Sequence, residues 1–490
     1  MHTYQKFSAL GIICLSLLLL INCSFQDDDL GLGGFDNFSG GDRYNDFEEN
    51  PFVKVTDQPV STFSVDADGA SYANVRRFLQ QDRALPPKAA VRTEEMINYF
   101  DLDYPFAEAN HPIDLNGEVS ECPWNISNKL IRIGIKGQPL PPGEVPPANF
   151  VFLIDVSGSM GAEDKLELLK SEFKLFVDQL SADDKVAIVT YAGSAGVVLP
   201  STSGSEKNTI KNAIDQLGSG GSTAGAEGII TAYKIAEENF TEGGNNRIII
   251  GTDGDFNVGP ASQDELVDLI KEKRESGIFI TVLGVGRGNL NDGALEQIAN
   301  NGNGTYEYID NLAQLRKVFI YDYSKFYTVA KDVKVQVDFN PTLVDSYRLI
   351  GYENRLLEED EFENDTVDGG EIGADQNITA LYEIIPVSGA NLRAFPTFTI
   401  DFRYKLPSSD VSIPLNLEVF DENTSFAESS DFMRFTASIA AFSMVLRDSE
   451  YKGTATPEKV SSWLSSTSLT DVHNFKSELR SLVDWVGQQD

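Results

Sequence analysis

The sequence predicts an α/β protein in which a doubly wound, mostly parallel sheet is inserted in, or flanked by, a β-rich, sandwich-like body that ends in helices. Three observations predict this architecture. Continuous apolar runs alternate with helix-like stripes over residues 148–320, which is typical of repeated β-α-β units. Apolar and polar residues alternate at 113–136 and 333–419, which indicates strands with one buried face. Amphipathic stripes at 432–446 and 472–486 predict closing helices.

The α/β region follows a breaker at 139–147, where five prolines in nine residues exclude a helix. Its first element, Phe150–Ile154, is wholly apolar, as expected of a strand buried on both faces. The pattern predicts further strands at 186–189, 248–250, 278–285 and 306–309, and helices at 166–180, 210–217, 224–240, 266–273, 295–299 and 312–318.

The flanking regions carry strands on both sides of the α/β region. Residues 130–136 alternate cleanly before it, and the pattern after it predicts strands at 347–352, 378–385, 398–404 and 413–419. Two short helices are expected at 72–79 and 96–100. We expect the strands before and after the α/β region to pair in one β-rich body.

Composition narrows the classes of function. Lys and Arg number 39 and Asp and Glu 75, so the net charge of −36 argues against binding to nucleic acid or to anionic lipid through basic residues. The chain has only three histidines, so neither a multi-histidine zinc site nor a Ser-His-Asp triad is expected. No G-x-x-x-x-G-K-[ST] or G-x-S-x-G motif occurs, and we expect a protein that is not an enzyme.

The N-terminus has the pattern of an export signal. Lys6 precedes an apolar run at 7–21, which is short for a bilayer span. The run ends at Cys23 in a sequence that resembles a bacterial lipobox, which implies a signal peptide over 1–22 and lipidation of Cys23. A plain signal peptide and an uncleaved anchor are the alternatives. Residues 23–50 are acidic and rich in Gly and Asp, as in a tether.

Oxygen-bearing side chains cluster in three segments of the α/β region. Asp155, Ser157 and Ser159 directly follow the first buried strand, Thr223 precedes an expected helix, and Asp253 follows the strand at 248–250. Ligands of open α/β sheets bind outside the carboxyl ends of the strands, so these segments are expected at one edge. Carboxylate and hydroxyl oxygens suit Mg²⁺, Mn²⁺ or Ca²⁺ better than zinc or copper.

This constellation resembles the von Willebrand factor type A domain, a Rossmann-like fold, and its metal-ion-dependent adhesion site. The resemblance implies that Asp155, Ser157, Ser159, Thr223 and Asp253 hold Mg²⁺, with Mn²⁺ or Ca²⁺ as alternatives. It implies direct ligation by the two serines and, for Asp155 and Asp253, often ligation through water. One coordination position then stays open for an Asp or Glu of a protein partner.

The flanks look like those of bacterial von Willebrand type A lipoproteins. The matching segments are 61–66, 70–78, 94–100, 347–355 and 380–384. The resemblance implies an N-terminal associated region at 51–147, the type A domain at 148–320 and a C-terminal β-rich region at 321–490.

We therefore expect a lipoprotein that binds a protein partner, anchored in a bacterial outer membrane, exposed at the cell surface or facing the periplasm. A structural or assembly role, in which the metal only orders the loops, is the alternative. A metal-dependent hydrolase is a further one.

Overall fold

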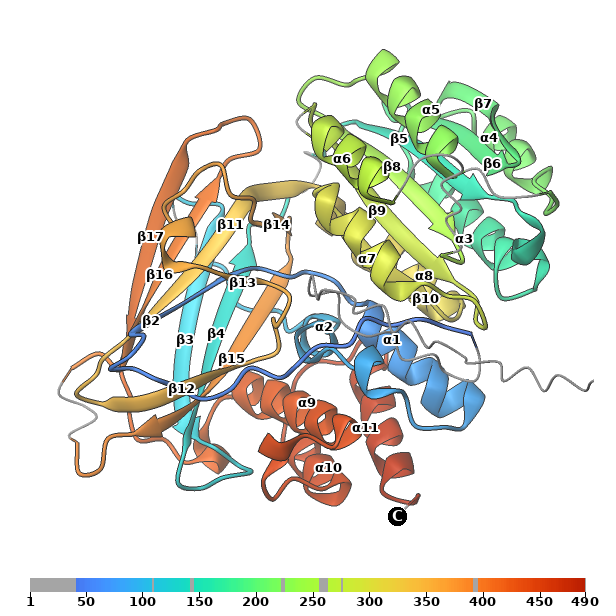
Figure 1. The fold of residues 1–490 in the computed structure, drawn as a ribbon. Helices are drawn as coiled ribbons and strands as arrows, with labels where there is room; N and C mark the ends of the chain where they lie inside the picture. The colour runs from blue at the N-terminus through green and yellow to red at the C-terminus, as the bar shows by residue number, and fades with distance from the viewer. Residues whose placement is uncertain are drawn as a thin grey trace, which may run out of the picture.

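The computed structural model describes residues 41–107, 110–141, 145–221, 225–254, 263–274, 276–390 and 395–489. It contains an α/β domain, a sandwich of two antiparallel sheets, and helices packed beside both (Figure 1). The expected signal peptide, Cys23 and Thr223 lie outside the described residues. The domain bounds given above stay predictions. Within the described part, no helix has the length and apolar character that crossing a bilayer requires.

The sheet of the α/β domain is mostly parallel, as predicted. Its order is β10-β9-β8-β5-β6-β7, and only the pair β6–β7 is antiparallel. The strands are β5 (Ala148–Asp155), β6 (Lys185–Ala192), β7 (Ser194–Ser203), β8 (Asn245–Thr252), β9 (Ile278–Val285) and β10 (Thr305–Ile309). The pattern did not predict β7, because this edge strand is largely exposed and carries no regular apolar alternation.

Helices cover both faces of this sheet. They are α3 (Leu166–Gln179), α4 (Lys207–Asp215), α5 (Gly225–Glu238), α6 (Gln263–Arg274), α7 (Asp292–Asn301) and α8 (Leu312–Arg316). Side chains of β5 alternate between two cores. Phe150, Phe152 and Ile154 pack with α3 and α4, whereas Val151 and Leu153 pack with α5, α6 and α7. Burial on both faces explains why β5 is apolar throughout.

Strands from both sides of the α/β domain share the β-sandwich, which confirms the predicted pairing. One sheet has the order β1-β12-β15-β4-β3 and joins β4 to β15 over eight residue pairs. The other has the order β13-β2-β11-β16-β17, with β14 also on β11. The strands are β1 (Val53–Lys54), β2 (Val60–Ser64), β3 (Ile113–Glu121), β4 (Lys129–Gly137), β11 (Thr328–Phe339), β12 (Val344–Ile350), β13 (Leu356–Leu357), β14 (Gly370–Gly373), β15 (Asn377–Pro386), β16 (Phe398–Lys405) and β17 (Ser412–Val419).

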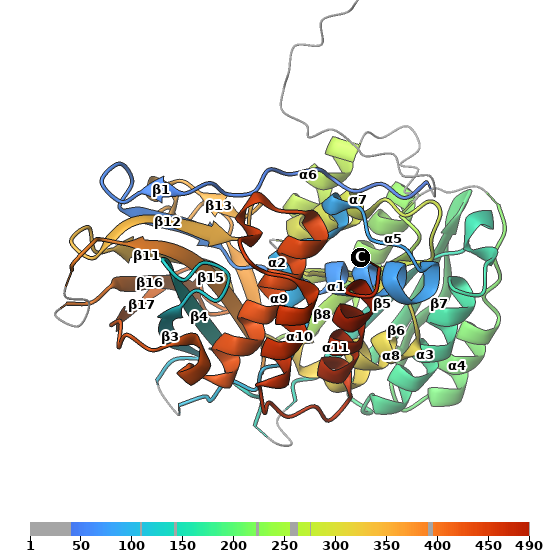
Figure 2. The same ribbon diagram turned by 90° about the horizontal axis from the view of Figure 1, so that it is seen from below.

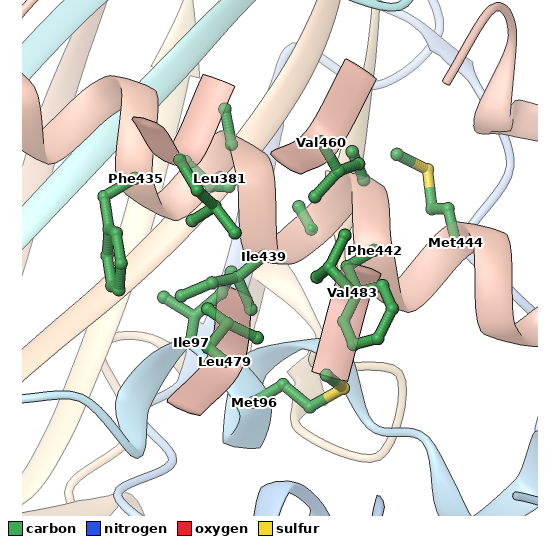
Figure 3. Packing of buried hydrophobic residues seen from close by; sticks show 14 of the residues in the cluster. Met96, Ile97, Leu381, Phe435, Ile439, Phe442, Met444, Val460, Leu479 and Val483 are labelled. Atoms are coloured by element: carbon green, nitrogen blue, oxygen red, sulfur yellow. The ribbon is translucent and has the colours of Figure 1, made fainter. Parts of the chain in front are cut away.

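The remaining helices come from both ends of the chain. They are α1 (Ala70–Arg77), α2 (Thr93–Asn98), α9 (Asp431–Arg447), α10 (Pro457–Ser465) and α11 (Phe475–Val486). Their apolar side chains form one core, in which Ile97 and Met96 of α2 meet Ile439 and Phe442 of α9 (Figure 3). Leu381 of β15 belongs to the same core, so this layer is fixed to the sandwich.

Arg76 ties the helical layer to the α/β domain. Its guanidinium is fully buried and bonds Asp310, which follows β10, at 2.5 Å. It also bonds Glu478 of α11 at 3.0 Å. One side chain of α1 thereby joins the α/β domain to the C-terminal helix, and we expect the two units to hold a fixed orientation.

The N-terminal segment binds the loop between β9 and α7. Asp42 accepts hydrogen bonds from the backbone N–H groups of Gly288 (2.7 Å) and Leu290 (3.1 Å), and Arg43 exchanges backbone bonds with Leu290 (2.8 Å) and Asp292 (3.0 Å). From there the chain crosses to β1 in the sandwich (Figure 2). The chain therefore enters the described part beside the carboxyl end of β9.

Candidate metal centre

The candidate centre lies at the carboxyl edge of the α/β sheet, where two neighbouring strands end. Asp155 is the last residue of β5, and Asp253 directly follows β8. These strands pair in parallel, so their ends meet at one edge. The structure therefore brings together side chains that lie about one hundred residues apart in the sequence.

The loop after β5 folds around the carboxylate of Asp155. The backbone N–H of Ser157 donates to Asp155 Oδ1 at 2.8 Å, and the hydroxyls of Ser157 and Ser159 lie 3.0 Å apart. A short 3-10 turn, η3 (Gly158–Gly161), begins after Ser157. Asp155 and Ser157 are buried and Ser159 is exposed, so the oxygen cluster extends from the interior to the surface.

The loop after β8 is bonded to the first one. The hydroxyl of Thr252 donates to Asp155 Oδ2 at 3.1 Å and accepts from the backbone N–H of Gly254 at 3.1 Å. Ser159 hydrogen-bonds to the carboxylate of Asp253. Asp155 and Asp253 are thus both fully buried and linked through hydroxyl groups.

The described start of the third loop also packs here. The backbone N–H of Gly158 donates to the carbonyl of Gly221 at 3.2 Å, and that of Gly220 donates to the carbonyl of Val156 at 2.7 Å. Gly221 has a φ of +90°, a conformation that favours glycine. Thr223, two residues further on, lies outside the described residues, so its place in the cluster stays a prediction.

A buried lysine contacts the same cluster. Lys165, just before α3, places its ammonium 3.0 Å from Asp253 Oδ2 and 2.8 Å from Asn289 Oδ1. Its aliphatic stem lies against Gly286, where an added Cβ would come within 2.2 Å of Lys165 Cε. Gly286 also has a φ of +73°. The glycine-rich turn after β9 therefore makes room for the lysine.

The two carboxylates differ in their pKa. Burial raises the pKa of Asp155, and the nearby Asp253 carboxylate adds to this, against the hydrogen bonds from Ser157 and Thr252. Burial by itself would also raise the pKa of Asp253. There, however, hydrogen bonds from Asn289, Ser159 and Lys165 outweigh it, and the net pKa lies below its usual value. Asp253 is therefore the more firmly ionised of the two.

These residues fit a hard divalent cation. The donors are carboxylate and hydroxyl oxygens, as Mg²⁺ requires. Two carboxylates and one ammonium give the buried cluster a charge of −1. A bound Mg²⁺ would change this to +1, which favours an anionic group on the side facing solvent. That Asp155, Ser157, Ser159, Thr223 and Asp253 act as ligands stays a prediction.

Lys165 and Thr252 were not assigned a role from the sequence. Thr252 carried a weak signal, since it directly precedes Asp253 at the end of an apolar strand. Lys165 carried no such signal, because the residues that it contacts lie 88 and 124 positions further along the chain.

Three family models match the chain. They are the von Willebrand factor type A domain over residues 149–319, a von Willebrand factor model over 39–132, and the C-terminal region of the uncharacterized protein YfbK over 324–488. The matches extend over most of the described residues.

Individual relatives agree with these models. The chain is 40% identical over 469 residues to YfbK of Escherichia coli (strain K12), with 91% of this chain and 81% of that protein covered. It is 26% identical over 196 residues to the protein sll0103 of Synechocystis, covering 39% and 45%. A solved von Willebrand factor type A protein from Catenulispora acidiphila is 14% identical with a TM-score of 0.43, covering 77% of this chain and 98% of its own.

Proposed function

The chain belongs to the family of the YfbK protein and contains a von Willebrand factor type A domain, and from this premise we propose that it binds a protein partner through a metal-dependent face. A von Willebrand factor type A domain suggests protein–protein interaction. The finer proposal is that Mg²⁺ sits between the loops after β5 and β8 and that the partner presents an Asp or Glu.

One observation carries this proposal. Asp155, Ser157, Ser159 and Asp253 are joined by hydrogen bonds at the carboxyl edge of the sheet, and Ser159 reaches the surface. When bound, Mg²⁺ supplies a positive charge with an exchangeable coordination position. The buried carboxylates hold that charge in place, while Lys165 neutralises one of them.

The residual charge favours an acidic partner group. With Lys165 in the cluster, two carboxylates do not fully neutralise a divalent cation, so the face carries a local charge of about +1 on a protein whose net charge is −36. A partner carboxylate gains a charge-assisted contact there. Acidic surfaces elsewhere on the partner are repelled, which adds selectivity.

Capture of partners from envelope extracts tests the proposal. The full chain should retain its partners in Mg²⁺ and lose them in EDTA and in the Asp155→Ala variant. Asp183→Ala is the matched control, because Asp183 is exposed in the loop before β6, at the opposite edge of the sheet. Equal retention of partners in Mg²⁺, in EDTA and by the Asp155→Ala variant would refute the proposal.

The same measurements separate the alternative functions. Were metal removal to lower the melting temperature without changing partner retention, the structural or assembly role would be favoured. Turnover of a phosphoester or peptide library that disappears in Asp253→Ala would favour a hydrolase.

We also propose that Cys23 carries a lipid anchor in a bacterial outer membrane. The apolar run before Cys23 and the Gly/Asp-rich segment after it support this proposal. A chain with Cys23→Ser should then leave the membrane fraction and lose the mass of the acyl groups. Unchanged mass and fractionation would refute lipidation at this residue.

A further inference from the structure

A second group of acids lies where the sandwich, the helical layer and the α/β domain meet. Asp66 follows β2, and Glu94 and Glu95 belong to α2; their exposed fractions are 1%, 1% and 0%. One carboxylate oxygen of each lies within 4.8 Å of those of the other two. Three ionisable groups at this distance in a buried place repel one another strongly unless a positive charge joins them.

The group is incompletely bonded. Glu95 accepts from Arg92 and from the backbone N–H of Ser71, and Asp66 Oδ2 accepts from Arg355 at 3.0 Å. Glu94 Oε2 is buried and has no hydrogen-bond partner among the described residues. A buried carboxyl oxygen without a hydrogen-bond partner is costly, and a bound cation would satisfy it.

The junction also holds excess negative charge. Two guanidinium groups, those of Arg92 and Arg355, pair with five carboxyl groups, and Glu94 adds a sixth within 4.8 Å of Asp66 and Glu95. The carboxyl groups are those of Asp66, Asp68, Glu94, Glu95, Asp292 and Glu296. The acids of the junction therefore outnumber its guanidinium groups, and a bound cation would offset this excess.

The ligand set favours Ca²⁺. One oxygen of each carboxylate lies within 4.8 Å of the other two, close enough for one ion to contact all three. Ca²⁺ accepts about six to eight oxygen ligands in a flexible geometry, whereas Mg²⁺ requires a near-octahedral set. Three carboxylates held by two separate segments therefore suit Ca²⁺ better. A cavity of about 240 Å³, lined in part by Arg92, Glu94 and Glu296, reaches Glu94 and has room for water ligands.

We propose that Asp66, Glu94 and Glu95 form a second cation site, which binds Ca²⁺ at the junction of the sandwich and the α/β domain. Asp66 continues from β2 of the sandwich, whereas Glu296 on α7 belongs to the α/β domain and reaches the site through Arg92. Bound Ca²⁺ therefore stabilises the junction and fixes the orientation of the two units. The site is separate from the centre at Asp155 and does not depend on it.

Calcium titration of the full chain, purified in detergent and stripped with chelator, tests this site. The Asp155→Ala background removes the first centre, so that only the second site remains to bind the ion. Calorimetry should then show one Ca²⁺ per chain, with Mg²⁺ binding at least about tenfold more weakly. Adding Glu94→Gln should weaken Ca²⁺ binding at least about tenfold, whereas Glu359→Gln, at an exposed position, should leave it unchanged.

Thermal melting of the Asp155→Ala chain supplies a readout that needs no change in the acidic group. Ca²⁺ should raise its melting temperature, and Asp66→Asn serves as the second variant if Glu94→Gln does not fold. The site is refuted if Ca²⁺ produces neither heat nor a shift in melting, or if Glu94→Gln binds as tightly as its parent.

Discussion

Replacing Lys165 by methionine tests whether this lysine acts as the internal counter-charge of the metal centre. Methionine keeps most of the apolar stem that lies against Gly286 but removes the ammonium that stands 3.0 Å from Asp253 Oδ2. Asp253 is fully buried, and Lys165 is 5% exposed. Removing one partner of a buried ion pair costs about 3–5 kcal/mol, because the other charge is left unpaired.

In EDTA, we therefore expect Lys165→Met to lose about 3 kcal/mol of unfolding free energy. For a domain of this size, that loss lowers the melting temperature by about 6–12 °C. Magnesium should reverse most of it, since a ligand at one hundred times its Kd contributes about 2.7 kcal/mol. Without metal, the cluster carries a charge of −2 in the variant and −1 in the parent chain, so Mg²⁺ should also bind the variant more tightly.

Thermal unfolding followed by circular dichroism, in EDTA and in Mg²⁺, together with calorimetric titration, measures both effects. Lys174→Met is the control, because the pair of Lys174 with Asp215 lies at the surface and should contribute little to the unfolding free energy. A variant that melts like the parent in EDTA, or that binds Mg²⁺ more weakly, would refute the charge-balance reasoning.

Three further perturbations test other parts of the structure. Arg76→Met should lower the unfolding free energy by about 3 kcal/mol in denaturant titration, since Asp310 stays buried without its partner; adding Asp310→Asn should restore part of the loss, and an Arg76→Met variant as stable as the parent would contradict the inferred joint. Gly286→Ala should destabilise the chain by about 1–2 kcal/mol, because φ is +73° and the new Cβ would meet Lys165; melting curves unchanged in EDTA would contradict this. The pKa of Glu94 is raised to about 8, against about 4.3 in the unfolded chain. Protonation of Glu94 therefore stabilises the chelated chain; this contribution is complete below about pH 4.3 and is lost as the pH rises through 8. The melting temperature of Glu94→Gln should change less across pH 5–9 than that of the parent, and equal changes would contradict the shift.

The architecture could be predicted where burial imposes a simple pattern. The apolar run of β5 indicated a strand with both faces covered, and the position of Asp155 at its end followed from the edge where ligands of such sheets bind. The pairing of strands from both sides of the α/β domain was also predicted. Strand β7 was not, since an edge strand with an exposed face needs no apolar alternation.

The chemistry of the centre was only partly predictable. Asp155, Ser157, Ser159 and Asp253 stand next to strand ends and so carried a positional signal. Lys165 reaches Asp253 and Asn289 only because three loops meet in space, and no local pattern records such a contact. The acidic group has the same difficulty, because Asp66 and Glu94 belong to separate segments and are two of 75 acids in the chain.

The attachment of Asp42 and Arg43 to the loop after β9 has a consequence for where binding takes place. The proposed lipid on Cys23 is 42 − 23 = 19 residues from Asp42, and such a length spans at most about 65 Å even when fully drawn out. Asp42 lies beside the loop that contacts Lys165, so a lipid on Cys23 would keep the proposed metal face within about this distance of the bilayer. A partner held in the same membrane would then meet the face at a higher effective concentration than one that diffuses freely.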